Sequence, residues 1–229
     1  MKVTTDACLF GAWVPLDSSG PLRILDVGTG TGLLSLMLAQ RNLEGVVDAI
    51  ELDAEAASQA TENVAASPFA DRITVRQCDA RLWMPDQKYD LVISNPPFFS
   101  DSLQSCNARR MDVRHSNTLA MDDLLSLARK SLKKDGMLAV LWPSIAYTKW
   151  AAAAHAKGFK EIYKLNVFPS SNAQQTRVAT VWQHAEGNVQ PNSMETLFIE
   201  EERGQYTDRF VELLAPFYLR LSAGESSAQ

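Results

Sequence analysis

The segment Asn95-Pro96-Pro97-Phe98 combines residue types that could activate a weakly nucleophilic amine. An amine on an aromatic ring attacks poorly, because its lone pair is delocalised into the ring. The Asn95 side-chain oxygen and the Pro96 carbonyl are neutral acceptors that could bind both N–H groups and favour a pyramidal nitrogen. Phe98 offers a flat face on which a base can stack. We therefore predict catalytic roles for Asn95, Pro96 and Phe98; the alternative is a strand terminator, because two prolines end a central strand.

A glycine-rich loop lies upstream, at Asp26-Val27-Gly28-Thr29-Gly30-Thr31-Gly32, directly after an apolar run. Glycines at such a place let the backbone approach a ligand and present N–H groups at a helix N-terminus. A nicotinamide-binding fingerprint would have Gly-x-Gly-x-x-Gly, but Leu33 stands at the third glycine. The loop resembles motif I of class I methyltransferases that use S-adenosyl-L-methionine (SAM); a tight turn without a ligand is the alternative. The loop residues predicted to bind the cofactor are Asp26, Gly28, Gly30 and Gly32.

Two acids follow the next two expected strands. Glu51 lies 23 residues after Gly28, close to the spacing of about 20 for an acid that binds ribose hydroxyls. Asp79 follows the strand expected at 72–77, and the resemblance to methyltransferases implies that it receives the adenine amine of the cofactor. A cap or turn role is the alternative for Asp79. Asp53 is expected to cap the following helix.

Apolar runs alternate with helical patterns along most of the chain. Strands separated by helices predict a parallel sheet with helices on both faces, and two late strands with no helix between them predict an antiparallel edge. We predict an α/β, Rossmann-like class I methyltransferase fold with a mostly parallel seven-stranded sheet and an antiparallel edge strand. Residues 1–221 are expected to form one domain, with a packed helix in 206–221, and 222–229 a disordered tail. Strands are expected at 22–27, 46–51, 72–77, 90–94, 137–142, 160–168 and 177–184, and helices at 33–40, 54–66, 118–133 and 145–157.

Composition excludes several classes of protein. The chain has 229 residues, of which 46% are hydrophobic and 21% charged, which is ordinary for a globular protein. The first residues hold no apolar signal core, and no apolar run is long enough to span a membrane. Three cysteines are too few and too scattered for a disulfide framework or a zinc site. We therefore expect a cytoplasmic protein with no metal and no membrane partner.

The net charge of −5 argues against a nucleic-acid-binding protein. Residues 107–134 nevertheless hold seven basic residues against three acids. Only local charge matters to a phosphate at contact distance, so this stretch predicts a basic patch that binds nucleic-acid phosphates. A solvated surface is the alternative interpretation.

Further segments resemble bacterial tRNA(Val) adenine-N6 methyltransferases, which modify the adenine immediately 3′ of the anticodon. The likeness covers the opening 2–13, the glycine loop, 95–99, and the pairs at 108–109 and 114–115, and continues in 217–219. Members usually carry a short segment before the Lys-Val-Thr-Thr-Asp stretch. This chain starts inside the stretch, at Met1, so we expect either a truncated chain or an internal start. The resemblance implies that Asp6 and Asn95 contact the cofactor. The residues it implies for substrate binding are Phe98, Phe99, Arg109, Arg110 and Arg114.

The leading functional prediction is a monomeric, SAM-dependent tRNA adenine-N6 methyltransferase whose second product is S-adenosyl-L-homocysteine. Two alternatives use the same chemistry, a protein-glutamine N5-methyltransferase and a ribosomal RNA guanine-N2 methyltransferase. The first usually carries an N-terminal helical domain that does not fit here, and the second often has a second domain for which this chain is too short. A third alternative is a non-catalytic SAM- or RNA-binding module, which need not retain a polar residue at Asn95.

Overall fold

The computed structural model describes residues 4–16, 20–97, 119–189 and 191–220. Within these residues a single sheet of nine strands has the order β3-β2-β1-β4-β5-β7-β6-β8-β9. The strands are β1 (Arg23–Val27), β2 (Val46–Glu51), β3 (Ile73–Gln77), β4 (Tyr89–Ser94), β5 (Leu132–Pro143), β6 (Phe159–Ser170), β7 (Arg177–His184), β8 (Ser193–Glu202) and β9 (Gln205–Tyr206). The helices are α1 (Thr5–Trp13), α2 (Leu33–Arg41), α3 (Ala54–Ala65), α5 (Met121–Ser131), α6 (Ser144–Ala156) and α7 (Asp208–Leu214), with short 3₁₀ turns η1 (Ala80–Leu82) and η2 (Ala215–Phe217).

The predicted fold class is confirmed, but two details of the sheet were wrong. The described sheet has nine strands where seven were expected, because β8 pairs in parallel with β6 and β9 pairs with β8. The antiparallel strand β7 is not at an edge either, because it lies between β5 and β6 and runs opposite to both. The helix expected within 206–221 is the short α7 followed by η2.

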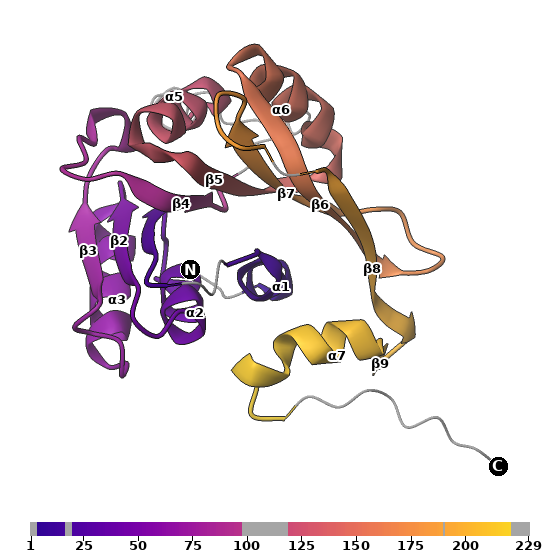
Figure 1. The fold of residues 1–229 in the computed structure, drawn as a ribbon. Helices are drawn as coiled ribbons and strands as arrows, with labels where there is room; N and C mark the ends of the chain where they lie inside the picture. Colours follow the sequence, from indigo (N-terminus) through magenta and orange to yellow (C-terminus); the bar gives the residue numbers. More distant parts are fainter. Residues whose placement is uncertain (1–3, 17–19, 98–118, 190, 221–229) are drawn as a thin grey trace, which may run out of the picture.

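Helices cover both faces of the sheet, as buried parallel strands require. Strand β1 is buried along four of its five residues, and its register with β2 and β4 is parallel on both sides. Side chains of α1, α2 and α3 join one hydrophobic cluster, and those of α5 and α6 join a second cluster on the opposite face. In Figure 1 the sheet arches over α1, with α5 and α6 on its outer side.

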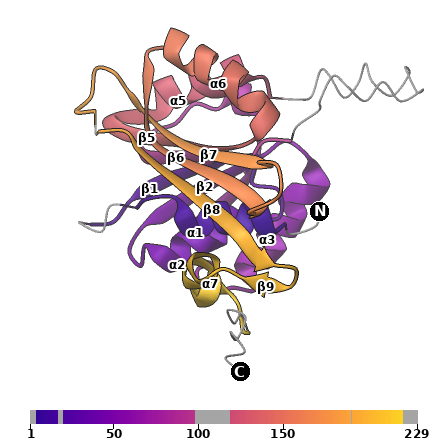
Figure 2. The ribbon, with the colours of Figure 1, turned by 90° about the vertical axis from the view of Figure 1, so that its right-hand side faces the viewer.

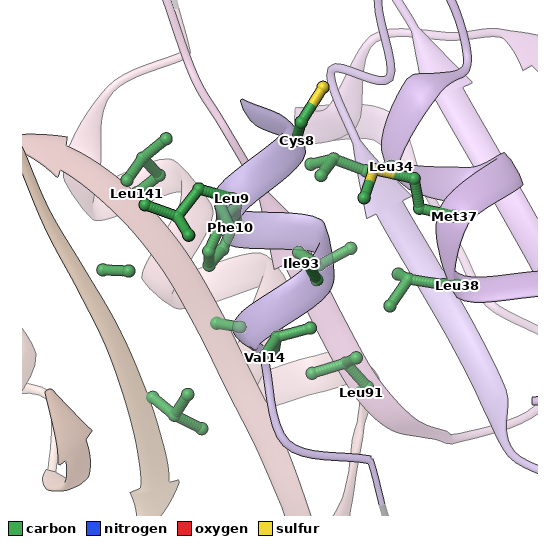
Figure 3. Packing of buried hydrophobic residues seen from close by; sticks show 14 of the residues in the cluster. Cys8, Leu9, Phe10, Val14, Leu34, Met37, Leu38, Leu91, Ile93 and Leu141 are labelled. Atoms are coloured by element: carbon green, nitrogen blue, oxygen red, sulfur yellow. The ribbon is translucent and has the colours of Figure 1, made fainter. Parts of the chain in front are cut away.

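Helix α1 was not predicted from the sequence, and the reason is its burial. The Thr4 side chain accepts a hydrogen bond from the Ala7 N–H and begins the helix. All six residues of 7–12 are buried, so no polar face marks the helix period. Figure 3 shows Leu9 and Phe10 directed toward the sheet. A Cβ at Gly11 would lie 2.8 Å from the Met37 sulfur, so glycine permits this close approach of α1 and α2.

The C-terminal elements close around α1: β8 and β9 are the last strands of the sheet, and α7 follows them (Figure 1). Figure 2 shows β6, β7 and β8 side by side, with β9 and α7 beyond the end of β8. Phe210 and Leu214 of α7 are buried in the same cluster as α1. The Trp13 indole N–H donates to Glu195 at 3.1 Å, and Arg209 binds the other oxygen of that carboxylate at 2.8 Å. The last described elements therefore fix the position of the first helix.

We expect Phe210→Ala to lower the free energy of unfolding by about 3–4 kcal/mol, because it leaves a cavity between α7 and α1. Denaturant unfolding measures this change. The control is Leu43→Ala, which removes an apolar side chain that is 77% exposed and should change stability by less than about 0.5 kcal/mol. Equal effects of the two substitutions would contradict the enclosing role of α7.

Candidate functional site

Four neighbouring parallel strands end at one edge of the sheet, and the loops that follow them line a cavity of about 350 Å³. The register pairs Val27 with both Ile50 and Ser94, and Glu51 with Gln77, so the carboxyl ends of β1, β2, β3 and β4 meet. Ligands of open α/β sheets bind at this edge. The predicted residues that line the cavity are Asp6, Gly28, Glu51, Asp79, Asn95 and Pro96.

The Glu51 carboxylate ties the glycine loop to the end of β2. One oxygen accepts the Gly30 N–H at 2.9 Å, and the other accepts the Asp53 N–H at 3.0 Å. Asp53 in turn caps α3 through the Ala56 N–H, as predicted. The glycine loop needs left-handed backbone, with φ values of 70°, 58° and 83° at Gly28, Gly30 and Gly32. Gly28 lines the cavity, whereas Gly30 and Gly32 are buried and shape the loop from behind.

Asp26 is buried beneath the glycine loop and does not line the cavity. One carboxylate oxygen accepts the hydroxyls of Thr29 at 2.6 Å and Ser35 at 2.7 Å. The other oxygen is buried and has no hydrogen-bond partner. Burial raises the pKa of Asp26 from 3.8 to about 6, although the hydrogen bonds from Thr29 and Ser35 oppose this shift. Asp26 therefore holds the glycine loop in place through Thr29 and Ser35, and it places a poorly solvated carboxylate next to the cavity.

Asp79 stands at the far wall of the cavity and is already paired. Its carboxylate accepts the Arg81 guanidinium through both oxygens, at 2.9 Å and 2.6 Å, and also accepts the Arg81 N–H as the cap of η1. The hydrogen bond from Arg81 lowers the pKa of Asp79. The carboxylate is thus an acceptor at neutral pH, and the capping alternative also holds.

Asn95 and Pro96 lie where β4 leaves the sheet. The buried Ser94 hydroxyl donates to the Val27 carbonyl at 2.7 Å and fixes the end of β4 against β1. Asn95 is half-buried in the cavity wall, and Pro97 beside it is exposed. The acceptor pair predicted from Asn95 and Pro96 therefore faces the same cavity as Glu51 and Gly28. Phe98, Phe99, Arg109, Arg110 and Arg114 lie outside the described residues.

Arg177, the first residue of β7, also lines the cavity, and no sequence motif had pointed to it. Its guanidinium Nε lies 3.1 Å from an Asp6 carboxylate oxygen, so α1 and β7 meet at the cavity wall. Arg177 belongs to no local motif. Its place depends on the insertion of β7 between β5 and β6, which sequence spacing does not reveal.

The described half of the basic stretch 107–134 does not line the cavity, and the prediction that this stretch binds nucleic-acid phosphates stays a prediction. Arg129 and Lys130 lie in the last turn of α5, and Lys133 and Lys134 lie near the start of β5. Residue 132 pairs with the first residue of β4, so these four side chains lie at the amino edge of the sheet. Strand geometry places that edge roughly 20 Å from the cavity. Lys133 binds both oxygens of Asp90 there.

Two other structural features concern membranes and metals. Among residues 4–16, 20–97, 119–189 and 191–220, no helix is long and apolar enough to cross a bilayer. The same residues contain no cluster of three or more potential metal-ligating His, Cys, Asp and Glu side chains.

Residues 15–157 match the family described as methyltransferase small domain. The tRNA1(Val) (adenine(37)-N6)-methyltransferase of Dyadobacter fermentans is 40% identical over 221 residues, which cover 96% of this chain and 91% of that protein. The protein of the same name from Citrobacter koseri is 37% identical, covering 96% of this chain and 89% of its own length.

Solved structures share the fold at lower sequence identity. The crystal structure of a predicted O-methyltransferase from Agrobacterium tumefaciens has a TM-score of 0.70 at 22% identity, covering 91% of this chain and 94% of that one. The glycopeptide N-methyltransferase MtfA, solved in complex with SAM, has a TM-score of 0.55 at 16% identity, covering 79% and 86% of the two chains. These likenesses establish the fold.

We expect Asp26 to make folding stability depend on pH. Its pKa in the folded protein lies above the unfolded value of 3.8, so its contribution is fully present below about pH 3.8 and is lost as the pH rises to about 6. The loss amounts to about 3 kcal/mol. We expect Asp26→Asn to remove this decrease in the free energy of unfolding between pH 4 and 7, measured by urea unfolding. The comparison is of the pH dependence, so it holds even if the substitution changes stability at every pH. The exposed acid Asp86 serves as the control, and a slope that survives in Asp26→Asn would contradict the assignment.

Proposed function

Because the chain belongs to the family of tRNA1(Val) (adenine(37)-N6)-methyltransferases, we propose that it transfers the methyl group of SAM to an adenine N6 in tRNA. The target is the adenine immediately 3′ of the anticodon in tRNA(Val), and S-adenosyl-L-homocysteine is the second product. The observation that supports this proposal best is the cavity that brings Asn95 and Pro96 together with Gly28, Glu51 and Asp79. The enzyme acts as a cytoplasmic monomer.

The cavity residues suit the cofactor in size and in chemistry. A volume of about 350 Å³ lies within the usual range for small-molecule sites. Glu51 presents its carboxylate to the ribose hydroxyls, Asp79 presents an acceptor to the adenine amine, and the Gly28 backbone lets the ligand approach closely. Asp6 meets the methionine end. Gly30 and Gly32 do not contact the cofactor but set the shape of the loop. Asp26 lies beneath the loop, holds it through hydrogen bonds and contributes a negative charge.

Asn95 and the Pro96 carbonyl would hold both hydrogens of the target amine and direct its lone pair into the cavity. The bound cofactor supplies a methyl group that positive sulfur already activates, so the amine needs no strong base before attack. The adenine must leave its stack to reach Asn95, which costs a few kcal/mol. Stacking on Phe98 would offset part of this cost. Phe99 and the three arginines Arg109, Arg110 and Arg114 are proposed to contact the tRNA at the entrance.

We expect Glu51→Ala to weaken SAM binding by about 1.5–3 kcal/mol, because charge-assisted hydrogen bonds to the ribose and to the loop are lost together. Isothermal titration calorimetry measures this effect. The matched control is Glu55→Ala, an exposed acid in the first turn of α3 that does not line the cavity. Unchanged affinity in Glu51→Ala would exclude the ribose role.

We expect Asn95→Ala to slow methyl transfer by roughly 100-fold or more, since a preorganised polar contact to the reacting amine is lost. SAM affinity should stay nearly unchanged, because the contact strengthens only as the nitrogen becomes pyramidal. Single-turnover methylation at saturating SAM and a separate SAM titration measure the two terms. Asn192→Ala, an exposed amide on the loop before β8, is the control. A full transfer rate in Asn95→Ala would refute the proposed mechanism.

The function itself is tested with labelled SAM and total tRNA, followed by mass spectrometry of the modified nucleoside. N6-methyladenosine next to the tRNA(Val) anticodon is the expected product. Label on a protein glutamine or on a guanine N2 would instead indicate one of the related enzymes. SAM binding without transfer to any of these would indicate a binding module.

A further inference from the structure

The cavity has a basic residue, Arg177, on the side away from Glu51 and Asp79. Across the sheet, Asp79, Glu51, Gly28 and Asn95 follow β3, β2, β1 and β4 in that order, and Arg177 begins β7 on the other side of β5. Two strand spacings, about 10 Å, separate β4 from β7. Arg177 therefore lies beyond the amine-binding residues, opposite to the proposed position of the cofactor adenine.

The backbone around Arg177 is held by a network of hydrogen bonds. Ser144 donates its hydroxyl to the Gln175 carbonyl at 2.7 Å and its N–H to the Thr176 carbonyl at 3.1 Å. The Gln175 amide donates to the Asn166 side chain at 2.8 Å and to the Arg177 carbonyl at 3.3 Å. Three elements, β6, α6 and β7, thus fix the place from which this arginine reaches the cavity.

The Arg177 guanidinium has an anionic partner in the free protein. Its Nε binds the Asp6 carboxylate at 3.1 Å, and its Nη1 donates to the Thr176 carbonyl at 3.1 Å. The side chain remains 35% exposed, so solvent or a ligand can reach the group. A planar guanidinium matches a phosphate as well as a carboxylate. Asp6 therefore occupies the position that a phosphate oxygen would compete for.

We propose that Arg177 binds a backbone phosphate flanking the target adenosine. This inference rests on the proposed function. A purine whose exocyclic amine is held at Asn95 extends its sugar and phosphates away from that residue. The span between the β4 and β7 ends matches the reach from the amine of a nucleotide to its own backbone. Asp6 orients the guanidinium before the RNA arrives.

The test compares an anticodon stem-loop with one in which a neutral methylphosphonate replaces a phosphate beside the target adenosine. Wild-type protein should bind the neutral RNA about tenfold more weakly at one of the two flanking positions. Arg177→Ala should bind the natural RNA about as weakly, should show no further loss with the neutral RNA, and should have a salt dependence lower by about 0.7–0.9. Arg177→Lys should recover the salt dependence in part.

Arg23→Ala is the matched control. Arg23 also binds an aspartate at 3.1 Å and is 32% exposed, but it lies at the amino edge of the sheet. It should bind both RNAs like wild type. Isothermal titration with SAM shows whether Arg177→Ala acts only through Asp6, because a loss of the Asp6 contact would lower SAM affinity rather than RNA affinity.

Two results would overturn the inference. In one, Arg177→Ala still loses affinity on neutralisation of the same phosphate. In the other, Arg177→Ala and Asp6→Asn lose SAM affinity equally while RNA binding keeps its salt dependence. A failure of the proposed function itself is distinguishable, because the wild-type protein would then leave the natural stem-loop unmethylated.

Discussion

The parallel register of β1 with both of its neighbours is the constraint on which the site depends. Strands that run in the same direction release their following loops at one edge, so residues separated by up to about seventy positions meet without a local motif that joins them. The inner strands β1 and β4 are buried along most of their length, so helices must cover both faces of the sheet there. The same pairing thus requires the helical layers and creates the cavity.

Helix α1 is positioned by the same sheet, and it in turn positions the first described residues of the chain. A helix that is apolar on every side gains nothing from facing water, so the sheet, α2 and α7 must all surround it. Its two ends are then held by polar contacts of different kinds, Asp6 with Arg177 and Trp13 with Glu195. The position of Asp6 at the cavity follows from the packing of the residues behind it.

Much of the site could be predicted, because each motif follows an apolar run and the carboxyl-edge rule brings such motifs together. Gly28, Glu51, Asp79 and Asn95 all lie at the predicted edge. The rule of alternating elements could not find α1, which lacks a polar face, or β8, whose acidic end obscures its strand pattern. It also gave no position to Arg177, whose neighbours are set by the reversed strand β7.

The described basic residues of 107–134 lie at the amino edge of the sheet, which their order along the sequence did not reveal. A helix that returns along the sheet carries its last turn back to the amino edge, so α5 brings Arg129 and Lys130 away from Asn95.

The closure of α7 over α1 has a consequence for the order of folding. The Trp13–Glu195 hydrogen bond joins residues 182 positions apart, and contacts of such separation slow folding because a long loop must close first. During synthesis the first helix is made long before β8 and α7 exist. Its apolar surface therefore stays only partly covered until nearly the whole chain has been made. We expect the growing chain to be most prone to aggregation during that interval. The exposure ends when β8 and α7 cover the apolar surface of α1.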